Sequence, residues 1–115
     1  MKKIILSVAF MGILTLSVIA DDKKEALDFF NSYVNAANTY SNTIQDMYSP
    51  SAKIIRQVLK PDGTTVDVDT DTATYMRQLK LGQAGAKLRH YTNSYTDVSV
   101  TPMSEGKFKV SSLRQ

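Results

Sequence analysis

The N-terminus constrains this chain most, because a short positive segment there is followed by a long apolar one. Lys2 and Lys3 supply the positive charge, and residues 4–20 carry none. Val18 and Ala20 occupy the −3 and −1 positions of a possible cleavage site. This order of charge, apolar core and small residues is that of a Sec-type export signal. Its positive end stays in the cytoplasm while the apolar part enters the translocation site. We therefore predict a leader that is cleaved after Ala20.

Two other fates of residues 1–20 stay open. An uncleaved segment would anchor the protein in a membrane, although the run is at the lower limit of the roughly 20 residues that a spanning helix needs. The run could also form a buried core helix. Cleavage is favoured because Asp21 and Asp22 follow the run in place of stop-transfer charges. We expect a periplasmic or secreted protein, which would contact a membrane only if its leader stayed uncleaved.

Residues 21–115 have the length of one small domain. The whole chain has 14 Lys and Arg against 11 Asp and Glu, and two of the lysines belong to the leader. The remaining charges are nearly balanced and interspersed, so we expect no nucleic-acid partner. The chain has no Cys and one His, which excludes a His/Cys zinc site. We expect no metal and no cofactor.

Helical periodicity begins directly after the leader. Over residues 22–38, four apolar residues fall at helical spacing and predict an amphipathic helix. These residues are Leu27, Phe30, Val34 and Ala37. A second, short helix is predicted next, with Asn42 and Gln45 resembling a capping box. Its apolar face consists of Tyr40, Ile44, Met47 and Tyr48.

β-Branched residues dominate much of the rest of the chain. Four strands are predicted, over residues 52–60, 64–68, 88–101 and 107–113. Pro61-Asp62-Gly63 is a turn, because Pro presets φ and Gly accepts a positive φ. A third helix over residues 72–84 is interrupted near its end by Gly residues, and Thr70 or Asp71 can cap its start. The order ααββαββ predicts an α+β domain.

This order and several local sequences resemble the NTF2-like superfamily, also called SnoaL-like or ketosteroid-isomerase-like proteins. The resembling stretches are residues 30–36, 44–54, 97–102 and 106–110. Family members form a cystatin-like cone, in which a curved antiparallel sheet wraps around three helices and leaves a pocket. The resemblance implies this fold over residues 21–115, and a homodimer that forms through the sheet.

The chain departs from the family near its end. Family sheets usually continue beyond the strand that starts at Lys107, whereas this sequence stops at Gln115. The strand edge left bare would invite pairing with another chain. We expect an incomplete C-terminus, and the alternative is a partner chain that covers the edge.

A second departure concerns chemistry. Isomerase members carry a carboxylate base on the first strand of the family sheet, and the matching position holds Arg56, which cannot act as a base. Tyr33 matches the family's oxyanion-stabilising Tyr, but a donor without a base is not an isomerase. If Arg56 lines the pocket, its guanidinium can hold a carboxylate or phosphate. The alternatives are an ion pair with Asp97, or a side chain that reaches water.

The ligand-binding residues we predict are Tyr33, Arg56, Tyr75, His90 and Tyr91. Six tyrosines are present, and each offers an apolar body with a polar tip, which suits a mixed pocket. Tyr40 and Tyr48 are instead expected in the core. His90 is the only histidine, and its pKa range would allow acid–base chemistry, although a surface or hydrogen-bonded His is commoner.

Three acidic residues alternate at Asp67, Asp69 and Asp71. A calcium loop would need Gly at position 72 and Glu at position 78, where this chain has Thr72 and Gln78. Strand alternation places the carboxylates on a solvent face instead, with Asp71 free to cap the next helix.

Three functions follow from these patterns. We favour a non-catalytic module that binds a small amphipathic or anionic ligand in a pocket lined by Tyr and Arg. One alternative is a SnoaL-like enzyme of the isomerase, cyclase or hydrolase type that uses His90 or Asp97. The other is a structural or assembly protein that dimerises through its sheet and has a filled interior.

Overall fold

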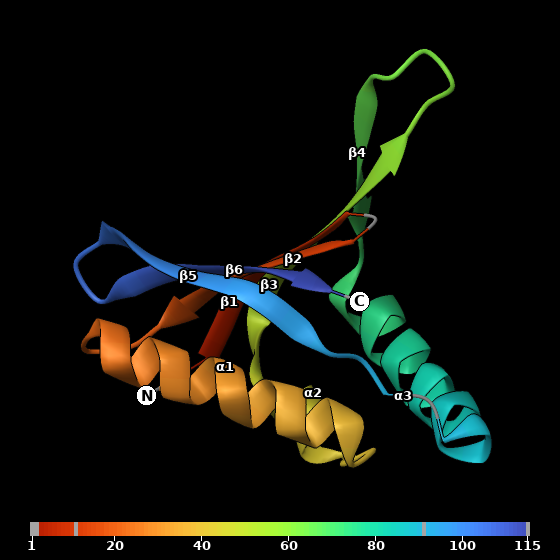
Figure 1. The fold of residues 1–115 in the computed structure, drawn as a ribbon, viewed down its shortest axis with the longest axis horizontal. Coiled ribbons are helices and arrows are strands. Elements are labelled where there is room, and N and C mark those ends of the chain that lie inside the picture. The colour runs from red at the N-terminus through yellow and green to blue at the C-terminus, as the bar shows by residue number, and fades with distance from the viewer. Residues whose placement is uncertain (1–2, 11, 91, 115) are drawn as a thin grey trace.

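The computed structural model describes residues 3–10, 12–90 and 92–114. These residues form an α+β fold with three helices and a curved, open, mixed sheet of six strands (Figure 1). The strands are β1 (Lys3–Phe10), β2 (Ile13–Ile19), β3 (Tyr48–Leu59), β4 (Thr65–Thr70), β5 (Tyr95–Ser104) and β6 (Lys107–Arg114). The helices are α1 (Lys23–Asn38), α2 (Thr43–Asp46) and α3 (Thr72–Arg89).

The strand order is β4-β3-β1-β2-β6-β5, so the N-terminal hairpin β1–β2 occupies the centre of the sheet. β1 runs parallel to β3, and the other neighbouring strands are antiparallel. The expectation of a purely antiparallel sheet is therefore wrong. The expected order ααββαββ is preceded by two further strands, because residues 3–10 and 13–19 pair as β1 and β2 within the sheet.

The hairpin β1–β2 turns at Gly12, whose φ of 82° is a conformation that glycine adopts without steric cost. Leu14, Leu16 and Val18 alternate along β2 and are buried. The alternative of a core helix is wrong, because this segment enters the core as strands. Among the described residues no helix is both long and apolar enough to cross a membrane. Export remains a prediction, and cleavage after Ala20 would remove both central strands.

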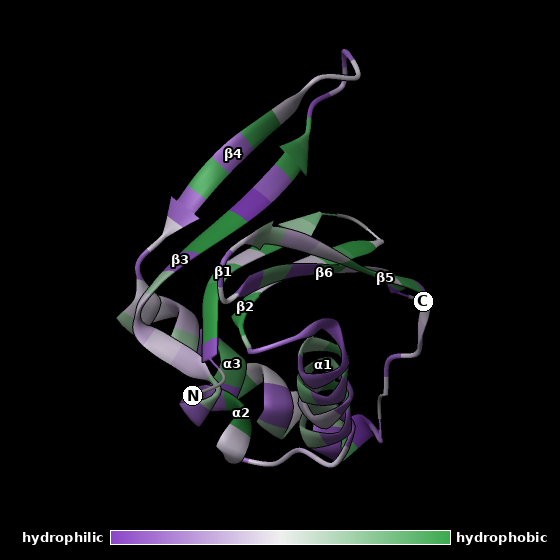
Figure 2. Ribbon diagram, turned by 90° about the vertical axis from the view of Figure 1, so that its left-hand side faces the viewer, coloured by the Kyte–Doolittle hydropathy of each residue, from purple (hydrophilic) through white to green (hydrophobic). Residues whose placement is uncertain are grey.

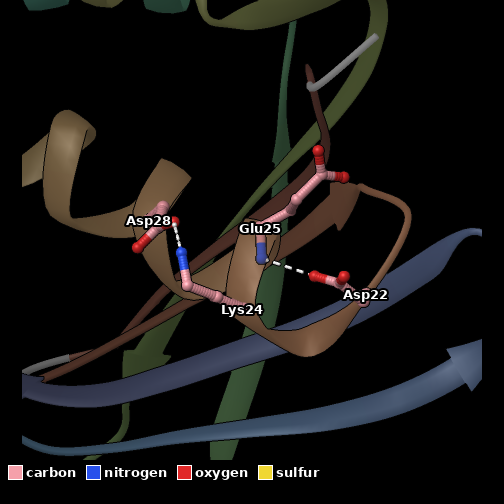
Figure 3. Close-up of polar contacts among 4 residues, drawn as sticks. All are labelled: Asp22, Lys24, Glu25 and Asp28. Carbon is pink, nitrogen blue, oxygen red and sulfur yellow. Dashed lines mark hydrogen bonds and ion pairs between the residues drawn. The ribbon is translucent and has the colours of Figure 1, made fainter.

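The helices lie on one face of the sheet, and the core fills the space between them (Figures 1 and 2). α1 begins where Asp22 Oδ1 accepts a hydrogen bond of 2.8 Å from the Glu25 backbone N–H, as Figure 3 shows. Lys24 and Asp28 form an ion pair of 3.1 Å on its exposed side (Figure 3). The helix was correctly predicted, and three of the four residues of its predicted apolar face are confirmed: Phe30 is buried, and Val34 and Ala37 are partly buried against the core. Leu27 is 37% exposed. The buried residues of α1 are Ala26, Phe29, Phe30, Tyr33 and Ala36.

The second helix is shorter than expected. α2 has one buried residue, Ile44, and Asn42 forms no side-chain cap, so the predicted capping box is wrong. Ser41 Oγ instead accepts from the Thr43 N–H at 3.2 Å. β3 then begins at Tyr48, which pairs with Ile4 of β1. The chain is therefore already extended before it reaches Pro50.

The third helix is longer than expected. Asp71 caps it as predicted, since Asp71 Oδ2 accepts from the Thr74 N–H at 3.1 Å. α3 continues through Gly82 and Gly85 to Arg89, because glycine inside a helix costs only about 1 kcal/mol relative to alanine. The strand predicted from residue 88 accordingly begins only at Tyr95.

The hairpin β3–β4 extends beyond the rest of the sheet (Figures 1 and 2). Its turn was correctly predicted: Gly63 has a φ of 88°, and the Lys60 N–H donates to the Thr64 carbonyl at 2.8 Å. Asp67 and Asp69 are exposed on β4 as predicted, but Val66 and Val68 between them are exposed too, so this strand has no buried face. This arm carries few buried side chains beyond its base at Ile54.

Candidate functional site

A cavity of about 390 Å³ lies between α1, α3 and the helix-facing side of the sheet. Its volume falls within the range of small-molecule sites. The apolar part of its wall comes from the sheet and all three helices, through Ala9, Leu14, Ala37, Ile44 and Leu79. The N-terminal hairpin β1–β2 therefore supplies part of the wall.

Two of the predicted site residues, Tyr33 and Tyr75, line this cavity. They are linked through Tyr48: the hydroxyls of Tyr33 and Tyr48 are 3.1 Å apart, and those of Tyr48 and Tyr75 are 3.2 Å apart. The rings of each pair meet edge to face, at interplanar angles of 71° and 69°. Tyr48 is buried, so its prediction as a core residue is confirmed, and it also connects the two site tyrosines.

Burial determines the protonation of this tyrosine chain. Desolvation raises the pKa of Tyr33 and of Tyr48 well above the ordinary value of 10.0. The phenols of Tyr33 and Tyr75 raise the pKa of Tyr48 further, whereas the hydrogen bond with Tyr48 opposes the rise at Tyr33 without cancelling it. Both side chains therefore stay neutral at physiological pH. Neutral phenols donate and accept hydrogen bonds, but at such pKa values they are poor general acids and bases.

Gln83 lines the same cavity from α3. Its Nε2 donates to the Ser41 carbonyl at 3.1 Å, which identifies the other amide atom as the oxygen. That oxygen, Oε1, is buried and has no hydrogen-bond partner among the described residues. A buried amide oxygen without a donor is unfavourable, by about 1–3 kcal/mol. Gln83 was not predicted, because no local pattern shows that it meets Ser41.

Two arginines, Arg89 and Arg114, line the cavity and are exposed. Arg89 Nε donates to the Gly85 carbonyl at 3.3 Å. Within the described part of the chain neither arginine has a carboxylate partner. Their charges are therefore available to an anion at the open side of the cavity. Neither was predicted, since residue 89 was expected in a strand.

A pair of hydrogen bonds connects α1 to the segment before β5. Asn38 Nδ2 donates to the Asn93 carbonyl at 2.9 Å, and Asn38 Oδ1 accepts from the Asn93 N–H at 3.0 Å. Both residues line the cavity. This contact holds the wall near Tyr95, whose ring meets that of Phe30 edge to face at 5.8 Å.

Other predicted site residues lie elsewhere. Arg56 is exposed and does not line the cavity, although it is opposite Ala9 of the cavity wall in the β1–β3 register. It cannot pair with Asp97, because three strands separate β3 from β5, and four strand spacings amount to roughly 19 Å. The expected alternative that its side chain reaches water agrees with this exposure.

His90 and Tyr91 also differ from the expectation. His90 ends α3 with a φ of 51° and is exposed, so its assignment to a strand is wrong. It does not line the cavity. Tyr91 lies outside the described residues. Asp97 is exposed, with a φ of 53°, where the β5–β6 register is irregular.

Nothing in the described ranges gathers three or more His, Cys, Asp or Glu side chains as a metal site would require. Protein-family models, curated proteins and solved structures contain no match to this chain. The functional argument therefore depends on the geometry of the cavity.

Proposed function

We propose that the protein is a non-catalytic binding module that holds a small amphipathic or anionic ligand in the cavity between α1, α3 and the sheet. The observation that carries the proposal is the composition of the cavity wall. Apolar side chains line much of it, Tyr33 and Tyr75 contribute phenols, and Arg89 and Arg114 are exposed cations. An amphipathic anion matches each of these surfaces.

The same geometry favours binding over catalysis. The enzymatic alternative needs His90 or Asp97 at the site, and neither lines the cavity. The phenols of Tyr33 and Tyr48 have raised pKa values and stay protonated. The assembly alternative expects a filled interior, whereas this interior has an open volume of about 390 Å³.

We also propose the NTF2-like superfamily as the family of this chain. The order of elements after residue 20 and the curved sheet that packs on three helices support it. A homodimer remains part of the proposal, whereas export with cleavage after Ala20 competes with it, because cleavage would remove Ala9 and Leu14 from the cavity wall. Because Ala9 and Leu14 belong to the cavity wall, the ligand-binding form is the one that retains residues 3–19. The intact mass of the exported protein tests this point.

Binding is tested with a fluorescent amphipathic anion, 8-anilinonaphthalene-1-sulfonate, and with a variant that fills the cavity. Leu79 lines the cavity, so Leu79→Trp should abolish saturable binding. The matched control is Leu81→Trp on the same helix, where Leu81 is 74% exposed and its replacement should leave binding unchanged. Native mass spectrometry of the purified protein should detect a retained ligand in the parent chain and in the control. Equal binding by both variants, or none by the parent chain, would refute the proposed function.

A further inference from the structure

The outer side of α3 carries two leucines that stand almost fully in solvent. Leu81 is 74% exposed and Leu88 85%, the two highest values among the large apolar side chains of the described residues. They are about two helical turns apart, so they lie on one side of the helix, with the exposed Ala84 between them. Figure 1 shows α3 at the periphery of the fold. These three residues form what we call the leucine row.

The other side of α3 holds the helix on the molecule. Tyr75, Met76 and Leu79 are partly buried and pack against the core. Their spacing places them on the side of the helix opposite the leucine row. Packing therefore accounts for the apolar residues of the inner side, whereas the leucine row is a separate apolar surface that contributes little to the fold.

Every charge on α3 is positive. Its 18 residues include Arg77, Lys80, Lys87 and Arg89, and no Asp or Glu. Each lysine directly precedes a leucine of the row, so the lysines follow the row along one side. All four cations are exposed, and none forms an ion pair with a described residue. Lys87 and Arg89 suit the C-terminal end of a helix dipole, but Arg77 and Lys80 precede the last turn, where that effect is lost.

An exposed apolar row bordered by cations matches the surface of an anionic membrane. Leucine side chains can enter the boundary between headgroups and acyl chains, while the long stems of lysine and arginine extend to the phosphates. Each cation near such a surface adds to the attraction. We therefore infer that α3 docks the protein on an anionic lipid surface, with Leu81 and Leu88 toward the acyl chains. This contact involves neither residues 1–20 nor the cavity, so it goes beyond the proposed function.

Two other occupants match this surface less well. A second copy that paired through the same helix would bring two sets of four cations together. A standard protein interface buries about 800 Å² on each partner and has few charged residues at its centre. The leucine row offers two leucines and one alanine on a convex helix, with cations beside them. A membrane needs no matching groove, because apolar insertion and charge attraction add together.

The test uses two kinds of vesicle, one of phosphatidylglycerol and phosphatidylcholine in equal parts, the other of phosphatidylcholine alone. Co-sedimentation of the full chain should show at least about tenfold tighter binding to the anionic vesicles. High salt should remove this preference, because it screens the exposed charges. Equal binding to both vesicles, or none to the anionic ones, would overturn the inference.

Tryptophan fluorescence locates the contact, because the chain contains no Trp. In Leu88→Trp the emission should shift to the blue on anionic vesicles as the indole leaves water. The matched control is Leu59→Trp on the β3–β4 arm, where Leu59 is also exposed and no shift is expected. A shift in the control, or no shift in Leu88→Trp, would show that the leucine row is not the contact.

A matched pair of double variants tests the cations. Lys80→Gln combined with Lys87→Gln should weaken binding to anionic vesicles about twenty-five-fold, at about fivefold for each cation. Lys60→Gln combined with Lys107→Gln changes the net charge equally at exposed positions away from α3, and should have little effect. Equal weakening in both double variants would mean that net charge alone determines binding, which refutes docking through α3. Circular dichroism verifies that each variant is folded, and the two vesicles decide the inference in the parent chain without them.

The cavity variant separates this inference from the proposed function. Leu79→Trp should abolish binding of the fluorescent anion but leave vesicle binding unchanged, because Leu79 lines the cavity and lies opposite the leucine row. Loss of vesicle binding in Leu79→Trp would mean that lipid enters the cavity, and it would refute docking through the row. If the parent chain binds anionic vesicles but not the fluorescent anion, the proposed function fails and this inference stands. If polyglutamate binds through Lys80 and Lys87 and the vesicles do not bind, the partner is an acidic protein and the membrane assignment fails.

Discussion

The hairpins β1–β2 and β3–β4 are neighbours in one sheet, and both contain apolar residues, yet their surroundings differ. In β2, Leu16 and Val18 are fully buried. In the β3–β4 arm, Val58 is 44% exposed, Leu59 47% and Val66 38%. Figure 2 shows the reason: the helices cover the central strands, and the arm extends past them. Burial therefore depends on what packs against a strand as well as on its hydropathy.

The strongest challenge to this comparison is removal of residues 1–20. The sheet would lose its two central strands and the cavity would lose part of its wall, so we expect no cooperative unfolding transition. Circular dichroism melts and NMR dispersion, with the full chain as reference, measure this. A shortened chain that folds and binds the fluorescent anion would show that the hairpin is dispensable, as expected for a cleaved leader.

A matched pair of leucines gives the next largest difference. Leu16→Ala removes a fully buried side chain and should lower the free energy of unfolding by about 2–5 kcal/mol. Leu59→Ala makes the same chemical change on the arm and should cost about 0.5 kcal/mol or less. Urea denaturation measures both. Equal losses would mean that the arm is covered in solution.

Tyr48 tests where along β3 the buried region ends. It lies at the start of the strand, and its hydroxyl joins those of Tyr33 and Tyr75. Tyr48→Phe should cost about 1–3 kcal/mol, because two hydroxyls lose their partner, and Tyr75→Phe should cost less. An unaffected Tyr48→Phe variant would place this chain of hydroxyls in contact with water.

The same tyrosines predict an alkaline limit to stability. The folded pKa values are raised above 10.0, so the unfolded chain loses protons first as the pH rises. Stability is then complete below pH 10.0 and declines above it. Tyr48→Phe should reduce this decline, as denaturation curves at increasing pH would show. A decline of equal slope in the variant would contradict the assignment.

The smallest effect is expected at the tip of the arm. The Thr64 hydroxyl and backbone N–H donate to Asp62 Oδ1 and lower the pKa of that carboxyl below its usual 3.8. Thr64→Val removes the hydroxyl, so the pKa of Asp62 should rise toward 3.8 in an NMR titration. The stabilisation from Asp62 is present above pH 3.8 and is lost as the pH falls through the lowered pKa. Its exposure makes the effect on unfolding too small to measure, and a clear loss of global stability would contradict that.

Local chemistry made several elements predictable. The amphipathic pattern of α1, the turn at Gly63, the cap at Asp71 and the final strand all depend on neighbouring residues. The limits of α3 and the exact buried face of α1 were not predictable, because long-range packing overrides weak local signals. Tyr33 and Tyr75 were predicted in the site. Gln83 was missed because its partner, Ser41, is 42 residues away in the sequence.

The sequence by itself determined an apolar N-terminal segment, an α+β order after it, and a supply of tyrosines and arginines. Only the tertiary structure decided that residues 3–10 and 13–19 form central strands, because an uncharged, largely apolar run by itself does not distinguish a leader or a core helix from a buried strand. It also decided which side chains meet across the cavity. Arg89 and Arg114 line it and Arg56 does not, since the curvature of the sheet and the path of α3 determine which cations reach the opening.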